Sequence, residues 1–262
     1  MKITQALIFG FLLAASFALG VFVGPELTTQ VSNFNSPLVS EKKKPVEQPY
    51  LVYTIPALQG KQFEPVSIDI VEPIATESAF TSYLFRTQFG ERHMTGQLNL
   101  PNVVDEQTPI ILMIRGYVPT EIYQTGIGTK NAAAVFARNG YITIAPDFFG
   151  VAGSDEELED VWAARFEKPA LMAQLIETVP TFQNGNHPIG IWAHSNGGQI
   201  ALTTLEISQR PIPTTIWAPV TAPFPYSVLY YSDEAEDEGR ATRLWINQLE
   251  SAYDLRQFSL RQ

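Results

Sequence analysis

The stretch that most constrains the fold of this chain runs from Pro188 to Leu202 and reads PIGIWAHSNGGQIAL. An apolar segment typical of a buried strand is followed, after one turn, by the small-residue start of a helix. The turn carries Ser195 in the pattern small-x-Ser-x-Gly, with Gly197 as the second small residue. A serine on such a turn stands clear of the backbone, where a base can reach its hydroxyl. The pattern predicts that Ser195 is a nucleophile; a chance Ser-x-Gly is the alternative, which the flanking strand and helix disfavour.

The three histidines of the chain argue against an ordinary catalytic triad. Where a nucleophilic serine occupies a turn of this kind, the acid and then the histidine follow it along the sequence. All three histidines here precede the serine: they are His93, His187 and His194. His194 neighbours the serine on a turn that directs adjacent side chains apart, and the other two fall in or before strands. We expect none of them to be the base. We also expect little or no turnover, because the chain is either a truncated enzyme or one that has lost its triad.

Composition narrows the classes of partner. The chain has 262 residues, of which 45% are hydrophobic, which suffices for one sizeable core. Its formal net charge is −10 and no basic patch is present, which excludes nucleic acid as an expected partner. Cysteine is absent and the histidines are not spaced as ligand pairs, so the sequence predicts no disulfide, no metal site and no cofactor.

The first 24 residues have the features of a membrane signal anchor. Residues 6–23 are apolar and uncharged, after a single cation at Lys2. About 20 apolar residues span a bilayer, whereas the apolar part of a cleaved signal is about 7–15 residues long. The length predicts a transmembrane helix within residues 1–24, with the rest of the chain on the extracytoplasmic side. A cleaved signal and a secreted protein are the alternative, because small side chains lie near the end of the run, at Ser16, Ala18 and Gly20.

The remainder of the chain divides into a tether and one domain. Residues 25–49 are polar and proline-rich and include three consecutive lysines, which predicts a flexible tether. Residues 50–262 form the predicted domain. Its first part contains short segments rich in aromatic and β-branched residues, which predict antiparallel strands at 50–55, 66–71, 80–89 and 93–100.

Strand and helix patterns alternate in the rest of the domain. Continuous apolar runs, of the kind found in strands buried on both faces, occur at 110–114, 141–145, 189–193 and 214–218. Helices are predicted at 130–139, 156–178 and 197–208. This alternation predicts an α/β fold, with a mostly parallel sheet that has helices on both faces.

Three segments are expected to surround Ser195. Arg115-Gly116-Tyr117 follows the first buried strand, where a loop that supplies one oxyanion-hole donor is expected; an ordinary strand-end turn is the alternative. The second donor is the backbone N–H of Asn196, directly after the nucleophile. Pro146–Asp155 follows the next buried strand and is expected to shape the chain beside the site without taking part in the chemistry.

The residues after the fourth buried strand are less specific. Aromatic side chains there either roof a substrate pocket or pack in the core; they are Phe224, Tyr226, Tyr230 and Tyr231. The acidic run at 233–238 predicts a solvated helix start, and a site for a cation or an amine is the alternative.

Four motifs together resemble the catalytic domain of the prolyl oligopeptidase family of serine peptidases, which has an α/β-hydrolase fold. They are MIRGYV (113–118), APDFFG (145–150), WAHSNGG (192–198) and WAPVTAPFP (217–225). The resemblance implies that Ser195 attacks a peptide carbonyl, while the Tyr117 hydroxyl and the Asn196 amide form the oxyanion hole. It also implies an aspartate and a histidine from loops after later strands. We find no counterpart for either before Gln262, so the C-terminal section of the fold is expected to be missing.

The resulting hypothesis is an exported, membrane-anchored serine peptidase that acts through an acyl-enzyme on Ser195 and is inactive in these 262 residues. The family's N-terminal propeller has no counterpart, so its substrate-size filter is not expected here. An esterase is one alternative, because the same turn serves ester hydrolysis. A catalytically inactive binding or scaffold protein at the membrane surface is another. The expected substrates are peptides or esters.

Overall fold

The computed structural model describes residues 47–232 and 235–259. The predicted anchor at 1–24 lies outside the described residues, and so does the predicted tether up to residue 46. Within the described part, no helix combines the length and the apolar character that crossing a membrane requires.

One seven-stranded sheet organises the described chain, in the order β1-β2-β3-β5-β4-β6-β7. The strands are β1 (Ile68–Thr76), β2 (Phe80–Phe89), β3 (Arg92–Pro101), β4 (Ile110–Ile114), β5 (Ile142–Pro146), β6 (Ile189–His194) and β7 (Thr214–Trp217). The first three form an antiparallel meander, and β3 is also antiparallel to β5. The last four run parallel to one another. The predicted α/β fold, with antiparallel strands that lead into a parallel sheet, is confirmed.

One predicted strand is wrong. Residues 50–55 belong to the 3-10 helix η1 (Pro49–Tyr53) and the start of helix α2 (Ile55–Gln59). Each of these helices has a proline in its first two positions, where the missing N–H has no intrahelical partner to lose. The Thr54 hydroxyl also accepts a hydrogen bond from the backbone N of Ala57, which caps α2. These start signals outweigh the aromatic and β-branched composition that suggested a strand.

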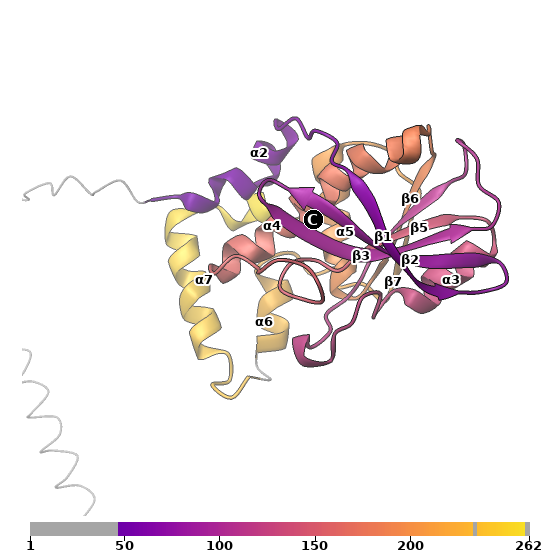
Figure 1. Cartoon of the computed structure of the whole chain (residues 1–262). Coiled ribbons are helices and arrows are strands. Elements are labelled where there is room, and N and C mark those ends of the chain that lie inside the picture. Colours follow the sequence, from indigo (N-terminus) through magenta and orange to yellow (C-terminus); the bar gives the residue numbers. More distant parts are fainter. Residues whose placement is uncertain (1–46, 233–234, 260–262) are drawn as a thin grey trace, which may run out of the picture. The chain divides into compact units, whose positions relative to one another are not determined.

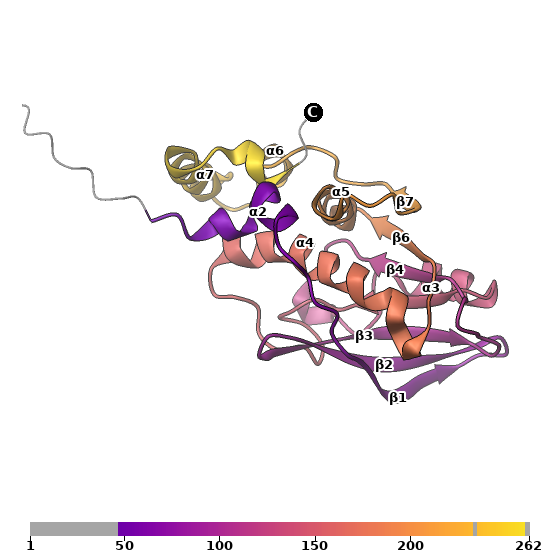
Figure 2. The same cartoon turned by 90° about the horizontal axis from the view of Figure 1, so that it is seen from above.

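Helices cover both faces of the parallel strands. Helices α4 (Val161–Thr178) and α5 (Asn196–Ser208) pack on one face, and α3 (Lys130–Arg138) packs on the other. Figures 1 and 2 show this arrangement from two directions. Because both faces are covered, the residues of β4 and β5 are almost all fully buried, which explains their continuous apolar sequences.

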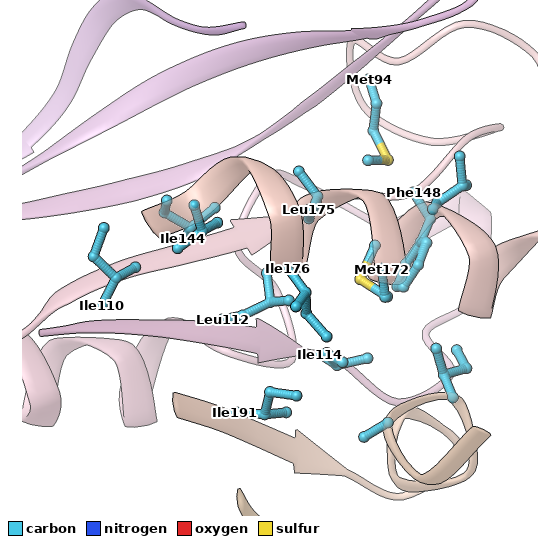
Figure 3. Packing of buried hydrophobic residues seen from close by; sticks show 14 of the residues in the cluster. Met94, Ile110, Leu112, Ile114, Ile144, Phe148, Met172, Leu175, Ile176 and Ile191 are labelled. Carbon is cyan, nitrogen blue, oxygen red and sulfur yellow. The ribbon is translucent and has the colours of Figure 1, made fainter. Parts of the chain in front are cut away.

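The main hydrophobic core lies between the sheet and α4 and α5 (Figure 3). Alternate residues of a strand point to opposite faces, so three residues of β4 and two of neighbouring strands meet three residues of α4 there: Ile110, Leu112, Ile114, Ile144 and Ile191 with Met172, Leu175 and Ile176. Met113 points to the other face and packs with Ala133 of α3.

Helix α4 begins later than the predicted residue 156. The Asp160 carboxylate accepts hydrogen bonds from the backbone N of Trp162 and of Ala163, both at 2.9 Å, and so fixes the first turn at Val161. Two further 3-10 helices lie in connections: η2 (Thr120–Ile122) and η3 (Val179–Asn184).

Segments from the two ends of the described chain pack side by side, as Figures 1 and 2 show. Helices α6 (Tyr226–Ser232), α7 (Arg240–Ala252) and η4 (Leu255–Phe258) follow β7. Together with η1 they surround Phe166 of α4, whose ring stacks on that of Phe258 at 4.4 Å. The Tyr253 hydroxyl accepts a hydrogen bond from the backbone N of Tyr50 at 3.0 Å. Among the described residues no strand follows β7.

Candidate active site

Ser195 occupies the turn between β6 and α5 in a conformation that few non-glycine residues adopt. Its φ is 52° and its ψ is −123°. Such backbone strain costs on the order of 1–3 kcal/mol and is typical of functional sites. Three backbone hydrogen bonds maintain it: Ser195 N donates to Trp217 O at 3.1 Å, and Ser195 O accepts from Gly198 N and Val220 N, both at 2.9 Å. The predicted nucleophile therefore stands on a strained turn that its neighbours hold in place.

Three glycines allow the chain to pack closely around this turn. A Cβ at Gly197 would overlap the carbonyl oxygens of Ile114 and Arg115 at the end of β4. A Cβ at Gly198 would lie 2.5 Å from the Cβ of Pro219, and one at Gly116 would lie 2.9 Å from the Cβ of Ser195. The small residues that the sequence motif requires are thus explained by close approach of three chain segments.

The two predicted oxyanion donors differ in their surroundings. Asn196 is the first residue of α5, where backbone N–H groups have no intrahelical acceptor. Its N–H donates to no group in the described part of the chain, so it is available to a ligand. The side chain of Tyr117 is 79% exposed and forms no hydrogen bond to any described residue. The role of the Tyr117 hydroxyl in an oxyanion hole stays a prediction, although the adjacent Gly116 does lie against Ser195.

A buried carboxylate ties together the loops that follow β4 and β5. Asp147 is fully buried and accepts hydrogen bonds from the hydroxyls of Thr95, Tyr123 and Thr125 at 2.7–2.8 Å. Burial and the nearby Asp147 charge raise the pKa of Tyr123 well above its usual range. The segment from residue 146 thus has the structural role that the sequence suggested.

Arg115 extends this network towards the nucleophile. Its guanidinium donates to the Asp147 carbonyl oxygen at 2.7 and 3.2 Å and to the Gly116 carbonyl oxygen at 3.0 Å. It also lies over the ring of Tyr123, 4.4 Å from the ring centre. Arg115 therefore fixes the main chain of the loop that touches Ser195.

No histidine hydrogen-bonds to Ser195 among the described residues. The ring nitrogens of His187 lie 2.8 Å from Thr108 O and 3.0 Å from Phe182 O, at the opposite end of β6 from the serine. His93 pairs with Asp155 at 3.4 Å on an exposed part of β3. His194 is the nearest in sequence, but its ring stacks on Trp192, 6.3 Å between ring centres. The Ser195 hydroxyl itself has no hydrogen-bond partner in the described part.

A cavity of about 380 Å³ begins at Asn196 and extends between α4, α5 and the C-terminal helices. Its walls include Trp162, Phe166, Phe224 and Phe258, and its polar lining includes Arg165 and Gln199. The sequence hypothesis anticipated an aromatic wall, which Phe224 supplies. The other three predicted aromatics lie outside this lining with exposed side chains: they are Tyr226, Tyr230 and Tyr231.

Arg165 is the polar residue of this cavity that the sequence did not reveal. It lies in α4, which is apolar on several sides, so the only sign of it in the sequence was a cation within a mostly buried helix.

The acidic run at 233–238 was better predicted. Asp237 accepts hydrogen bonds from the backbone N of Gly239 and of Ala241 at the start of α7. Asp233 and Glu234 lie outside the described residues.

Comparison with known proteins finds distant structural likenesses and no sequence relative. No family model matches the chain, and no curated protein matches it. Solved structures that are similar include a cold-adapted esterase from an Arctic intertidal metagenomic library, with 16% identity over 50% of this chain and 57% of that chain, and a TM-score of 0.38. An α/β hydrolase from Penicillium is 16% identical over 72% of this chain and 54% of that chain, with a TM-score of 0.41.

A protein from Pseudomonas aeruginosa is 16% identical over 68% of this chain and 55% of that chain, with a TM-score of 0.44. The chain thus spans little more than half the length of these structures. Because the likeness is distant, the assignment of an α/β-hydrolase fold depends on the chain's own features. These are the strand order, the parallel strands β4 to β7 and the strained serine between β6 and α5.

Proposed function

We propose that this protein is a serine hydrolase in which Ser195 attacks an ester carbonyl and forms an acyl-enzyme. The strained backbone of Ser195 is the single observation that carries the proposal. Glycine would adopt φ 52° without strain, and nothing else in the turn explains why a serine occupies this position. In the acylation step a bond forms between the serine oxygen and the carbonyl carbon, and the bond to the leaving oxygen breaks. The proton that Ser195 loses passes to the departing oxygen, which leaves as the alcohol.

In this proposal the Asn196 N–H, which is free of other partners among the described residues, stabilises the negative charge on the carbonyl oxygen. Fixed donors of this type lower the barrier by about 3 kcal/mol each in well-studied enzymes. No imidazole reaches Ser195 in the described part, which favours esters over peptides. An amine must be protonated to leave, whereas an activated alcohol leaves more readily without a general acid.

Peptide hydrolysis is the second candidate, and the resemblance of four motifs to prolyl oligopeptidases is what supports it. A single burst of product, followed by slow release of the acyl group, is the expected kinetic behaviour.

The test is covalent labelling of the full 262-residue chain with a fluorophosphonate probe, with the modified residue located by mass spectrometry. We expect modification of Ser195, loss of labelling in Ser195→Ala, and unchanged labelling in Ser208→Ala, which alters a serine elsewhere on α5. A p-nitrophenyl ester should give a burst of about one equivalent per chain. Absence of both signals would contradict the hydrolase and favour the binding or scaffold alternative.

We also propose that residues 1–24 anchor the protein in a membrane, with the domain on the extracytoplasmic side. The uncharged run at 6–23 supports this proposal. Retention of the chain in membranes after alkaline carbonate extraction is expected, together with protease digestion of the domain from the extracytoplasmic side only. Full release by carbonate would contradict the anchor, and the secreted alternative predicts a mature chain that starts near residue 21.

A further inference from the structure

The cavity beside Asn196 holds a cation that no described carboxylate balances. Arg165 donates from one guanidinium nitrogen to the side-chain oxygen of Gln199 at 2.8 Å and to the hydroxyl of Ser227 at 3.3 Å. Both partners are neutral, and among residues 47–232 and 235–259 no carboxylate forms an ion pair with Arg165. Keeping a partly buried charge without a counter-ion is unfavourable. An anion in the cavity would balance this charge.

The other charges around the cavity cancel one another. Lys168 pairs with Glu157 at 2.7 Å, and the neighbouring Glu167 pairs with Arg92 at 2.6 Å. Burial lowers the pKa of Arg165 to about 10, so it still carries its charge at neutral pH. The net charge that the described lining presents to a ligand is therefore the positive charge of Arg165.

Apolar walls strengthen the attraction between Arg165 and an anion. The ring of Trp162 meets that of Phe224 edge to face at 5.4 Å, and Phe166 stacks on Phe258 at 4.4 Å. These rings make much of the lining apolar, and electrostatic attraction is greater in apolar surroundings than in water. A cavity of about 380 Å³ fits a small aliphatic ligand.

The cavity is close to the nucleophile. Asn196, which follows Ser195, and Gln199, which contacts Arg165, are three residues apart on α5 and both line the cavity. Residues at this spacing are neighbours on one helix face, and one helical turn rises about 5.4 Å. Ser195 itself is not part of the lining, so its link to the cavity is through Asn196, and we expect a short acyl chain to span from Ser195 to Arg165.

We infer that Arg165, oriented by Gln199 and Ser227, binds a carboxylate on the acyl part of the substrate, so that the substrates are monoesters of short aliphatic dicarboxylic acids. This inference rests on the proposed hydrolase function of Ser195. Acylation joins the serine oxygen to the ester carbonyl carbon, breaks the bond to the alcohol oxygen and transfers the serine proton to that oxygen, so that the alcohol leaves. The distal carboxylate stays ionised on Arg165 and holds the acyl group in the cavity.

The test compares monomethyl glutarate with dimethyl glutarate, in which the distal carboxylate is capped as an ester. Binding is measured by calorimetry on full-length Ser195→Ala, which removes the chemistry. We expect monomethyl glutarate to bind at least 10-fold more tightly than the diester, because a charged hydrogen-bonded pair contributes about this factor. Arg165→Gln should abolish the preference and Arg165→Lys should keep part of it.

The double variant Lys168→Gln/Glu157→Gln is the matched control, since it removes both members of an ion pair at the same cavity and leaves its net charge unchanged. We expect it to change the affinity for monomethyl glutarate less than 2-fold. Equal binding of the two esters, or an equal loss in the double variant and Arg165→Gln, would overturn the inference. Should Arg165→Gln fail to fold, protection of wild-type Ser195 from fluorophosphonate by monomethyl glutarate, but not by the diester, provides the same test.

The experiments can contradict the hydrolase function of Ser195 and the carboxylate site at Arg165 independently of each other. If Ser195 is labelled but the monoester has no advantage over the diester, the carboxylate site is wrong and the hydrolase stands. If Ser195 is not labelled although the monoester binds to Ser195→Ala in an Arg165-dependent way, the anion site stands, but its description as a substrate site is overturned with the hydrolase.

Discussion

Gly116 lies directly against Ser195: a Cβ at position 116 would come within 2.9 Å of the Ser195 Cβ. The same atom would lie 3.2 Å from the carbonyl oxygen of His194. The loop after β4 therefore touches the nucleophile turn on both its main chain and its side chain. Any side chain at 116 would push the two segments apart.

Gly116→Ala should accordingly weaken the site more than the fold. Overpacking of this kind costs about 1–3 kcal/mol, and the displacement falls on Ser195. We expect the rate of fluorophosphonate labelling to fall at least 10-fold while the chain still folds cooperatively. Gly60→Ala is the control, because its nearest non-neighbouring atom would be 3.6 Å away. Unchanged labelling in Gly116→Ala would show that the loop moves without affecting the serine.

Ser195→Gly should be more stable than Ser195→Ala. The observed φ of 52° is unfavourable for serine and alanine and is accessible to glycine. We expect glycine to raise the free energy of unfolding by about 1–2 kcal/mol relative to alanine, measured by urea denaturation.

The opposite order is expected at Ser208, in the last turn of α5, where glycine should be less stable than alanine by up to about 1 kcal/mol. If Ser195→Gly is no more stable than Ser195→Ala, the turn is not strained in solution.

Arg115→Gln should reduce both stability and labelling. The substitution removes the donors to the Asp147 and Gly116 carbonyl oxygens, and charged hydrogen bonds of this kind contribute about 1.5–3 kcal/mol. We expect a loss of that size in chemical denaturation, and at least 10-fold slower labelling of Ser195. Arg138→Gln is the control: its pair with Glu77 is half-exposed, so the loss should stay below about 1 kcal/mol. An Arg115→Gln chain that is labelled at the wild-type rate would contradict this role.

Alkaline pH should destabilise the fold through Tyr123. Burial and the Asp147 charge raise the pKa of this phenol from its ordinary value of 10.0. The stabilisation is fully present below pH 10. Above pH 10 the unfolded chain releases the phenol proton and the folded chain retains it, so stability falls by up to about 1.4 kcal/mol per pH unit.

Urea midpoints measured between pH 8 and pH 11 check this. Tyr123→Phe should have a shallower decline above pH 10, but not a flat one, because the pKa of Tyr50 is also raised, chiefly by burial and its hydrogen bond to Asp160. A decline as steep as that of the wild type would show that Tyr123 does not remain protonated in the folded chain.

The sequence predictions succeeded where the structure depends on residues that are close together along the chain. The buried strand 110–114 and the turn at Ser195 were readable because apolar runs and small residues mark them locally. The predicted strand at 50–55 was wrong because proline positions and a threonine cap favour helices there. The start of α4 was misplaced because Asp160 resembles any other residue of an acidic stretch until its hydrogen bonds are known.

The sequence by itself determined the α/β alternation and the strand-turn-helix around Ser195, since these depend on neighbours along the chain. Only the tertiary structure decided that Gly116 contacts Ser195, that Asp147 joins two loops and that Arg165 faces the cavity beside Asn196. Each of these contacts joins residues that are at least 20 positions apart. Such contacts are set by how helices and loops pack on the sheet, which leaves no periodic signal in the sequence.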